Sequence, residues 1–345
     1  MGTGTDGPTV GLVVNPAAGR DIRRLTGGAS VNDNYAKRRT GECVVAGLEL
    51  ITDPVTALVM PDRASLGQRI AAAFEDDDRP VRVLEQSVSG TAEDTRRAAA
   101  RFAEVADAVV VLGGDGTTRD VATAIGTVPV VAVSTGTNNV VPTPMDGTVA
   151  GAAAALLATG AVDPTATTVN HGTVRATIES GGETETMIGL ATMGVLDRSF
   201  VGTRAILDAS EFVGAAVSRA FPTEIGLSGV AGGLLPTRPD DPGGVGLRFG
   251  PLEACDRRVR AITVPGVVSE LGIDEGRRLE ASDPFAFEVE RGVVTADGER
   301  EREVSDATVT FEVRDEGPRV VDVEGVFEAA ADAGVVAEDP RRSLD

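Results

Sequence analysis

A single carboxylate stands in a glycine-rich turn, in the run Gly113-Gly114-Asp115-Gly116-Thr117-Thr118. Four apolar residues, Val109-Val110-Val111-Leu112, lead directly into this turn and are typical of a buried parallel strand. The glycines predict a sharp turn and a close approach to another group. Either threonine is expected to cap a helix over residues 119–125. A strand, a glycine turn and a helix start in this order present backbone N–H groups to phosphate.

The position of Asp115 predicts its chemistry. Because an anion is a poor neighbour for phosphate, this carboxylate is expected to take a proton from a hydroxyl, or to hold a metal ion that binds phosphates. Phosphoryl transfer needs positioned phosphates, a divalent metal and a group that deprotonates the attacking hydroxyl. The turn can supply the first and Asp115 the last. The alternative is an ordinary tight turn before a helix.

Two further polar loops follow predicted strands. Asn15-Pro16-Ala17-Ala18-Gly19 follows residues 9–14; its asparagine amide can donate to a phosphate oxygen, and its glycine permits close approach. Ser134-Thr135-Gly136-Thr137-Asn138-Asn139 follows residues 128–133 and is dense in hydroxyls and amides. Ligands of parallel sheets bind at the carboxyl ends of the strands. We therefore expect the three loops to form one site.

Strand and helix patterns alternate over the first ~150 residues, which predicts a Rossmann-like parallel sheet with helices on both faces. Strands are expected at 9–14, 55–60, 81–84, 108–112 and 128–133, and helices at 35–50, 65–75, 91–104 and 147–158, the third opened by a capping box at Thr91. Short alternating strands follow at 171–179, 184–192, 259–264, 285–289, 293–296, 307–313 and 320–323, then a helix at 326–333.

This pattern predicts two domains. We expect a nucleotide-binding α/β domain over residues 1–160 and a mostly antiparallel β-sandwich domain, which would bind the acceptor substrate, over residues 161–323. The tail, residues 324–345, is expected to pack back on the first domain. The chain has 345 residues, of which 42% are hydrophobic and only 3% aromatic, so the cores must consist mainly of Val, Ala, Leu and Ile.

The net charge of −21 indicates a surface adapted to high salt, where dense acidic groups stay hydrated and their repulsion is screened. Such a charge disfavours binding to nucleic acid and to anionic membranes. Cys43 and Cys255 lack metal-ligand spacing, and His171 is the only histidine, so a multi-histidine metal site and a Ser-His-Asp triad are disfavoured. Neither a signal peptide nor an apolar run of transmembrane length is evident, and we expect a cytoplasmic protein.

These motifs resemble those of the NAD kinase and diacylglycerol kinase-like superfamily. Gly113-Gly114-Asp115-Gly116-Thr117 matches its signature, and Asn15-Pro16-Ala17-Ala18-Gly19 matches the turn after its first strand. Residues 125–160 are most similar to the ATP-NAD kinase branch that includes the acetoin-catabolism X-like proteins, and residues 196–202 and 229–236 are similar to it too. The resemblance covers nearly the whole chain.

The resemblance implies an ATP- and Mg²⁺-dependent kinase with its active site between an α/β domain and a β-sandwich domain. It implies that Asp115 activates the acceptor hydroxyl, which in an NAD kinase is the 2′-OH of the adenosine ribose. It also implies a small-molecule substrate, NAD foremost, and a homo-oligomer. The expected nucleotide-binding residues are Asn15, Gly19, Gly113, Gly114, Gly116, Thr117, Thr137, Asn138 and Asn139.

Several alternatives stay open. Two NAD kinase motifs are missing: the asparagine-acidic pair that opens the second domain, and a later threonine-x-x-glycine-serine-threonine-alanine-tyrosine stretch. A lipid or small-polyol kinase and a non-catalytic nucleotide-binding regulator are therefore alternatives, and polyphosphate could replace ATP. Asp297-Gly298-Glu299 resembles a lipid-kinase turn in which an acidic residue faces the site, although we favour an ordinary hairpin turn. Asn32-Asp33-Asn34-Tyr35 either reaches the site or caps a helix.

Overall fold

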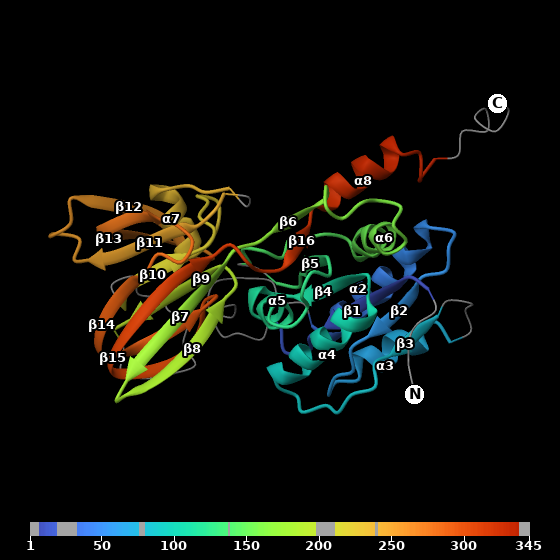
Figure 1. Cartoon of the computed structure of the whole chain (residues 1–345), viewed down its shortest axis with the longest axis horizontal. Coiled ribbons are helices and arrows are strands. Elements are labelled where there is room, and N and C mark those ends of the chain that lie inside the picture. The colour runs from blue at the N-terminus through green and yellow to red at the C-terminus, as the bar shows by residue number, and fades with distance from the viewer. Residues whose placement is uncertain are drawn as a thin grey trace.

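The chain forms two sheets, one in each of two domains that lie side by side (Figure 1). The computed structural model describes residues 7–18, 33–75, 80–136, 139–197, 211–238 and 241–337. Within these residues, the first sheet has seven strands in the order β3-β2-β1-β4-β5-β16-β6, and the second has nine in the order β12-β13-β11-β10-β9-β14-β15-β7-β8. The predicted parallel α/β domain followed by an antiparallel β domain is confirmed.

The first sheet reverses its direction of growth between β1 and β4. The chain runs outward from β1 to β2 and β3, then returns to add β4 and β5 on the other side of β1, all in parallel. Loops diverge at such a reversal and leave room for a ligand at the carboxyl ends of the strands. These strands are β1 (Thr9–Val14), β2 (Thr56–Val59), β3 (Val81–Val83), β4 (Ala108–Gly113) and β5 (Val130–Ser134).

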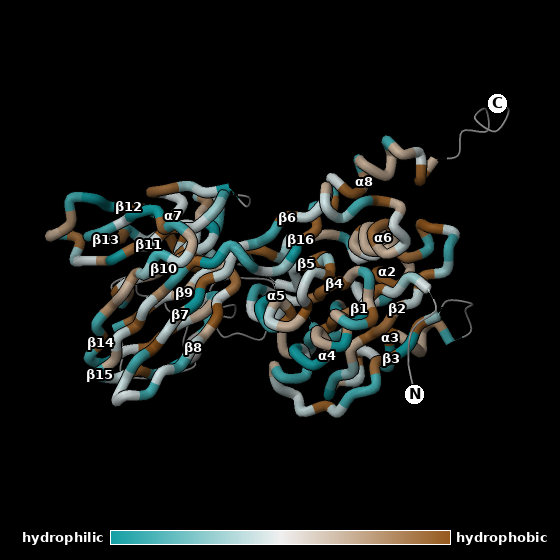
Figure 2. The backbone as a smooth tube through the Cα atoms, in the orientation of Figure 1, coloured by the Kyte–Doolittle hydropathy of each residue, from teal (hydrophilic) through white to brown (hydrophobic). Residues whose placement is uncertain are grey.

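Helices cover both faces of this sheet, so every residue of β1 and β4 is buried. One face carries α2 (Asn34–Gly47), which continues into a 3₁₀ turn (Leu48–Leu50), together with α3 (Leu66–Ala72), α6 (Gly147–Ala158) and α8 (Val323–Asp332). The other face carries α4 (Ala92–Val105) and α5 (Asp115–Ala122). Helix α6 is apolar along most of its length and packs against α2 and α8 (Figure 2).

The start of α5 differs from the prediction. The helix begins at Asp115, with Gly114 as its N-cap residue, so the predicted threonine cap is wrong. The Oγ1 of Thr118 instead donates back to the Gly114 carbonyl at 3.1 Å. A carboxylate in the first helical turn is stabilised by the positive end of the helix dipole, which favours starting the helix at Asp115.

Two other helix caps can be compared with the sequence. Thr91 is the N-cap residue of α4, but its side chain makes no capping hydrogen bond, so the predicted capping box is wrong. The Asp94 carboxylate instead accepts the backbone N–H groups of Ser89 and Gly90, at 2.8 and 2.6 Å. Asp33 caps α2 by accepting the N–H of Ala36 at 2.8 Å, so the capping alternative holds at this position.

The second sheet is antiparallel throughout. It curls over, so that β7 contacts β9 and β10, which are not its neighbours in the sheet. The curl encloses a core that includes Phe285, Phe287 and Phe311, and α7 (Leu227–Leu234) packs on the sheet against β12. The strands are β7 (Thr173–Ser180), β8 (Glu183–Gly189), β9 (Thr192–Leu196), β10 (Phe212–Val217), β11 (Gly244–Gly250), β12 (Arg257–Val264), β13 (Val267–Leu279), β14 (Phe285–Ala296) and β15 (Glu299–Arg314).

The chain leaves and re-enters the first sheet through two short strands. β6 (Thr168–Asn170) and β16 (Arg319–Val321) pair with each other, and β16 also pairs in parallel with β5. Helix α8 then buries Val326 and Ala330 in the core beside α6. The domain limits at residues 160 and 323 stay a prediction, although β6 and β16 lie in the first sheet. Among the described residues, no helix is long and apolar enough to cross a membrane.

Candidate functional site

The loops after β1 and β4 are in direct contact at the point where the sheet reverses. The Nδ2 of Asn15, the residue that follows β1, donates to the Oγ1 of Thr117 on α5 at 2.9 Å. The Asn15 N–H also donates to the carbonyl of Leu112, near the end of β4, at 3.4 Å. The structure therefore brings together two of the residues that the sequence predicted to bind nucleotide.

The glycines of the turn serve close packing. Gly114 alone separates β4 from α5, so the turn is as sharp as predicted, but it needs no left-handed residue: Gly114 has φ −113°, and Gly113 and Gly116 do not have positive φ angles. A Cβ on Gly113 would come within 2.6 Å of the Thr117 side chain. A Cβ on Gly116 would lie 3.2 Å from both carboxylate oxygens of Glu299, which belongs to the second domain. The absence of side chains thus lets Thr117 and Glu299 approach the backbone.

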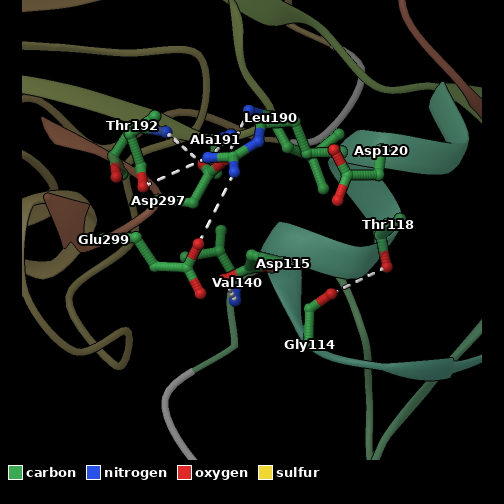
Figure 3. A network of polar contacts seen from close by, with 12 residues as sticks. Gly114, Asp115, Thr118, Asp120, Val140, Leu190, Ala191, Thr192, Asp297 and Glu299 are labelled. Atoms are coloured by element: carbon green, nitrogen blue, oxygen red, sulfur yellow. Dashed lines mark hydrogen bonds and ion pairs between the residues drawn. The ribbon is translucent and has the colours of Figure 1, made fainter. Parts of the chain in front are cut away.

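Asp115 is buried at the amino end of α5, with 6% of its surface exposed. Its carboxylate accepts the N–H groups of Val140 at 2.8 Å and Val141 at 3.0 Å (Figure 3). The Oδ1 of Asn139 accepts the N–H of Asp115 at 3.4 Å, and its Nδ2 donates to the Oγ of Ser134 at 2.6 Å. The third polar loop, after β5, is therefore anchored on the same carboxylate. An ionised carboxylate offers about four acceptor positions, so capacity remains for a ligand.

The surroundings of Asp115 make it a better base. Burial raises the pKa of its carboxyl to about 7, and the negative charge of Asp297 adds to the rise. The amide hydrogen bonds from Val141 and Val140 lower the pKa, and the charge of Glu224 raises it further. A carboxyl with a near-neutral pKa can accept a proton from a hydroxyl at neutral pH.

The hairpin between β14 and β15 faces this carboxyl from the second domain. Its two-residue turn consists of Asp297 and Gly298, with φ values of +50° and +76°, so the ordinary hairpin turn that we favoured is confirmed. The turn has a second role, because the buried Asp297 carboxylate accepts the N–H groups of Leu190 at 2.8 Å, Ala191 at 2.8 Å and Thr192 at 3.1 Å.

Arg119 on α5 joins the two domains. Its Nη1 lies 3.4 Å from Asp297 Oδ2 and 3.3 Å from the Ala296 carbonyl oxygen, and its Nη2 lies 3.5 Å from Glu299 Oε2. In Figure 3 Glu299 lies on the side of the first turn of α5, whereas the Asp297 carboxylate is turned toward the backbone of Leu190, Ala191 and Thr192. Our sequence reasoning gave Arg119 no role. The available signal was its spacing, because residues four apart share one face of a helix.

The only lysine of the chain stabilises the loop after β1. Lys37 on α2 is 1% exposed, and its Nζ donates to the carbonyl oxygens of Pro16, at 3.0 Å, and Ala18. Because the amine is buried, we expect an amine-reactive reagent to leave Lys37 unmodified in the folded protein and to modify it after denaturation. Peptide mass spectrometry checks this, and rapid labelling of Lys37 under folding conditions would contradict the buried position.

Three predicted site residues, Gly19, Thr137 and Asn138, lie outside the described residues. A surface hollow between the end of α3 and β3, lined by Phe74, Pro80 and Val81 among others, lies away from the loops that follow β1, β4 and β5. The described part of the site therefore consists of the three loops, the amino end of α5 and the β14–β15 hairpin.

Comparisons with known proteins agree with this architecture. Residues 10–161 match the family model of the ATP-NAD kinase N-terminal domain, and residues 174–316 match that of the acetoin catabolism protein X C-terminal domain. The chain is 32% identical over 330 residues to acetoin catabolism protein X of Cupriavidus necator, which covers 92% of this chain and 90% of that protein.

Two solved structures are similar at a lower level. Yeast NADH kinase complexed with NADH is 13% identical with a TM-score of 0.46, over 97% of this chain and 89% of that one. A diacylglycerol kinase from Bacillus anthracis str. Sterne is 14% identical with a TM-score of 0.34, over 92% of this chain and 97% of that one. Similarities of this size carry no argument about activity. The family follows from the sequence matches: the chain belongs to the acetoin catabolism protein X family, with an N-terminal domain of the ATP-NAD kinase type.

Proposed function

We propose that this protein is a kinase that transfers the terminal phosphoryl group of ATP to a hydroxyl, most specifically to the 2′-OH of the adenosine ribose of NAD. The observation that supports this best is the position of Asp115. A buried carboxyl with a pKa near 7 stands at the amino end of a helix where the parallel sheet reverses. The match to the ATP-NAD kinase N-terminal domain supports the same reaction.

The phosphates of ATP would bind at the amino end of α5. The first turn of a helix has backbone N–H groups without intrahelical partners, and its dipole favours an anion. Asn15 adds an amide donor, and Thr117 a hydroxyl, beside this turn. The acceptor oxygen then bonds to the terminal phosphorus, its proton passes to the Asp115 carboxylate, the bond to the bridging oxygen breaks, and ADP leaves.

A magnesium ion fits the site as part of the nucleotide complex. The described residues hold no group of three or more His, Cys, Asp or Glu side chains arranged to bind a metal. Mg²⁺ usually takes one or two carboxylates together with substrate phosphates. Because Asp115 serves as the base in this proposal, Glu299 is the carboxylate beside the first turn of α5 that would hold the ion. When bound, the ion would neutralise charge on the transferred phosphoryl group.

A non-catalytic nucleotide-binding regulator is the second candidate, and one observation favours it. Both oxygens of the Asp115 carboxylate accept backbone N–H groups from the loop after β5. This carboxylate could serve as a structural anchor for that loop. In that case the loss of Asp115 would weaken folding or nucleotide binding, and no phosphoryl transfer would exist to be lost.

A direct assay distinguishes the two candidates. The protein is incubated with ATP, Mg²⁺ and NAD at high KCl, because we propose that its net charge of −21 requires salt for folding. NADP is followed with an NADP-dependent dehydrogenase, and ADP is measured separately. A kinase acting on NAD gives equal amounts of both products. ADP formed with glycerol or another hydroxyl compound in place of NAD would indicate a different acceptor, and no ADP with any acceptor would favour the regulator.

The rate is expected to depend on pH through Asp115. Only the ionised carboxyl can accept a proton, so kcat should rise as pH increases through about 7, the pKa of this group. Replacing Asp297 with asparagine removes a negative charge that raises this pKa, and should move the rising limb to lower pH. Profiles of kcat against pH for both proteins check this. A profile that is flat around neutrality would contradict it.

The same pKa shift has a consequence for stability. Because folding raises the pKa of Asp115 above its unfolded value of 3.8, the folded state favours the protonated carboxyl. The stabilisation of the folded state that results from this shift is fully present below the unfolded pKa of 3.8, and it is lost as pH rises through about 7.

A further inference from the structure

A second group of buried polar side chains lies at the junction of the domains. Among the described residues, the buried His171 Nε2 has no hydrogen-bond partner, and burial together with the charge of the nearby Arg219 lowers the pKa of this ring. Arg219 Nε and Glu224 Oε1 form an ion pair at 2.7 Å, and the Ser228 hydroxyl and the Phe221 N–H also interact with the Glu224 carboxylate. Buried polar atoms normally have partners, so the unpaired His171 Nε2 beside this ion pair indicates a position for a bound group.

This polar cluster (His171, Arg219, Glu224 and Ser228) adjoins the hairpin that faces α5. Ser218, which precedes Arg219, donates through Oγ to the Leu190 carbonyl at 3.1 Å and through its N–H to the Ala191 carbonyl at 2.9 Å. The N–H groups of Leu190 and Ala191 are two of the three that Asp297 accepts. The backbone of Leu190 and Ala191 therefore connects the polar cluster, through Ser218, to the Asp297 turn.

The cluster also lies near the candidate base. Glu224 is close enough to Asp115 for its charge to raise the pKa of that carboxyl. A substrate with its hydroxyl at Asp115 could therefore extend toward Glu224 and His171. His171 follows β6 in the connection between the domains and is 3% exposed.

The cluster presents mainly hydrogen-bond acceptors. His171 Nδ1 lies 2.7 Å from the Gly172 carbonyl oxygen, which can only accept, so Nδ1 carries the proton and Nε2 is an acceptor. Burial lowers the pKa of His171 to about 4, which keeps the ring neutral at pH 7. The Glu224 carboxylate retains acceptor capacity beyond its contacts with Arg219 and Ser228, and the guanidinium of Arg219 offsets its charge. A bound group must therefore donate hydrogen bonds.

We propose that His171, Glu224 and Ser228 bind the part of the acceptor substrate that donates hydrogen bonds and carries no negative charge, such as a primary carboxamide or a diol. This inference rests on the proposed function, and for NAD it assigns the cluster to the carboxamide. A carboxylate in the same position has no proton to donate, and would leave the buried acceptors unpaired.

The test compares NAD with nicotinic acid adenine dinucleotide, in which a carboxylate replaces the carboxamide. Binding is measured by calorimetry without ATP, and phosphoryl transfer is measured with ATP and Mg²⁺. We expect the wild-type protein to bind NAD at least ~10-fold more tightly than the carboxylate analogue. His171→Leu should weaken NAD binding, and Glu224→Gln should reduce the discrimination. Glu288→Gln, on the exposed side of β14, is the matched control and should change neither.

The outcomes separate this inference from the proposed function. NADP formation with an unchanged KM for NAD in both His171→Leu and Glu224→Gln overturns the inference and leaves the kinase in place. Suppose that the wild type binds NAD selectively, that the variants lose this binding, and that no phosphoryl transfer is measured. This result supports the inference, and the proposed function fails. Equal binding of both dinucleotides, or binding of neither, overturns the inference. Thermal unfolding identifies variants that only destabilise the fold. Glu224→Gln is expected to stay folded, because glutamine has nearly the same shape as glutamate.

Discussion

Replacing Asp115 with asparagine is expected to lower kcat by about 10²–10⁴-fold while ATP still binds, because an amide cannot accept the proton of the acceptor hydroxyl. Asparagine has nearly the same volume and keeps one oxygen for the N–H of Val140 or Val141. The loop after β5 should therefore stay close to its place. Single-turnover rates and ATP titrations of the same preparations provide the measurement.

The matched control is Asp120→Asn on the same helix. Asp120 is also buried and pairs with Arg96 at 2.9 Å, on the face of α5 that packs toward α4. Its replacement removes an equal charge and should leave kcat within a few-fold of wild type. Unchanged turnover in Asp115→Asn would exclude the role of general base. A parallel loss of ATP affinity and stability would instead favour a structural anchor.

Replacing Asp297 with alanine is expected to lower the free energy of unfolding by about 3 kcal/mol or more. The change leaves the buried N–H groups of Leu190, Ala191 and Thr192 without their acceptor. It also places alanine at φ +50°, a conformation that aspartate and asparagine tolerate better. Arg119 loses one of its contacts between the domains. Denaturant unfolding at constant high salt measures the loss.

Asp297→Asn provides the comparison for this change. Asparagine tolerates the positive φ and keeps one acceptor oxygen, so it should lose clearly less stability than alanine does. If the alanine and asparagine variants are both as stable as wild type, the three amide hydrogen bonds do not hold the hairpin in place as described.

Elements with an unbroken pattern could be predicted from the sequence. The strand at 9–14 and the helix at 147–158 have the predicted limits, because the first is buried on both faces and the second is rich in alanine and leucine. Prediction failed for β10, β11 and β13 in the second domain. Their pairing shifts register, between Phe212 and Gly214 and again between Arg248 and Phe249. Such bulges break the two-residue alternation on which strand prediction depends.

Some features of the candidate site could likewise be predicted from the sequence, and others could not. Asp115 and Asn15 could be placed at one sheet edge because both directly follow buried parallel strands. The contacts of Arg119 with Asp297 and of Asp297 with Leu190 could not, because they join residues 178 and 107 positions apart. The polar cluster was missed for the same reason, because His171 lies far from the other three residues in the sequence. Considered alone, His171 only made a multi-histidine metal site and a Ser-His-Asp triad improbable.

The most direct test of the central claim is a crystal structure of the protein with a non-hydrolysable ATP analogue, Mg²⁺ and NAD. The account predicts that the terminal phosphate lies at the amino end of α5, between the loops after β1 and β4. It also predicts that the acceptor hydroxyl is hydrogen-bonded to the Asp115 carboxylate, within ~3.5 Å of the phosphorus atom. Phosphates bound elsewhere, for example in the hollow between α3 and β3, with Asp115 contacting only the loop after β5, would contradict it.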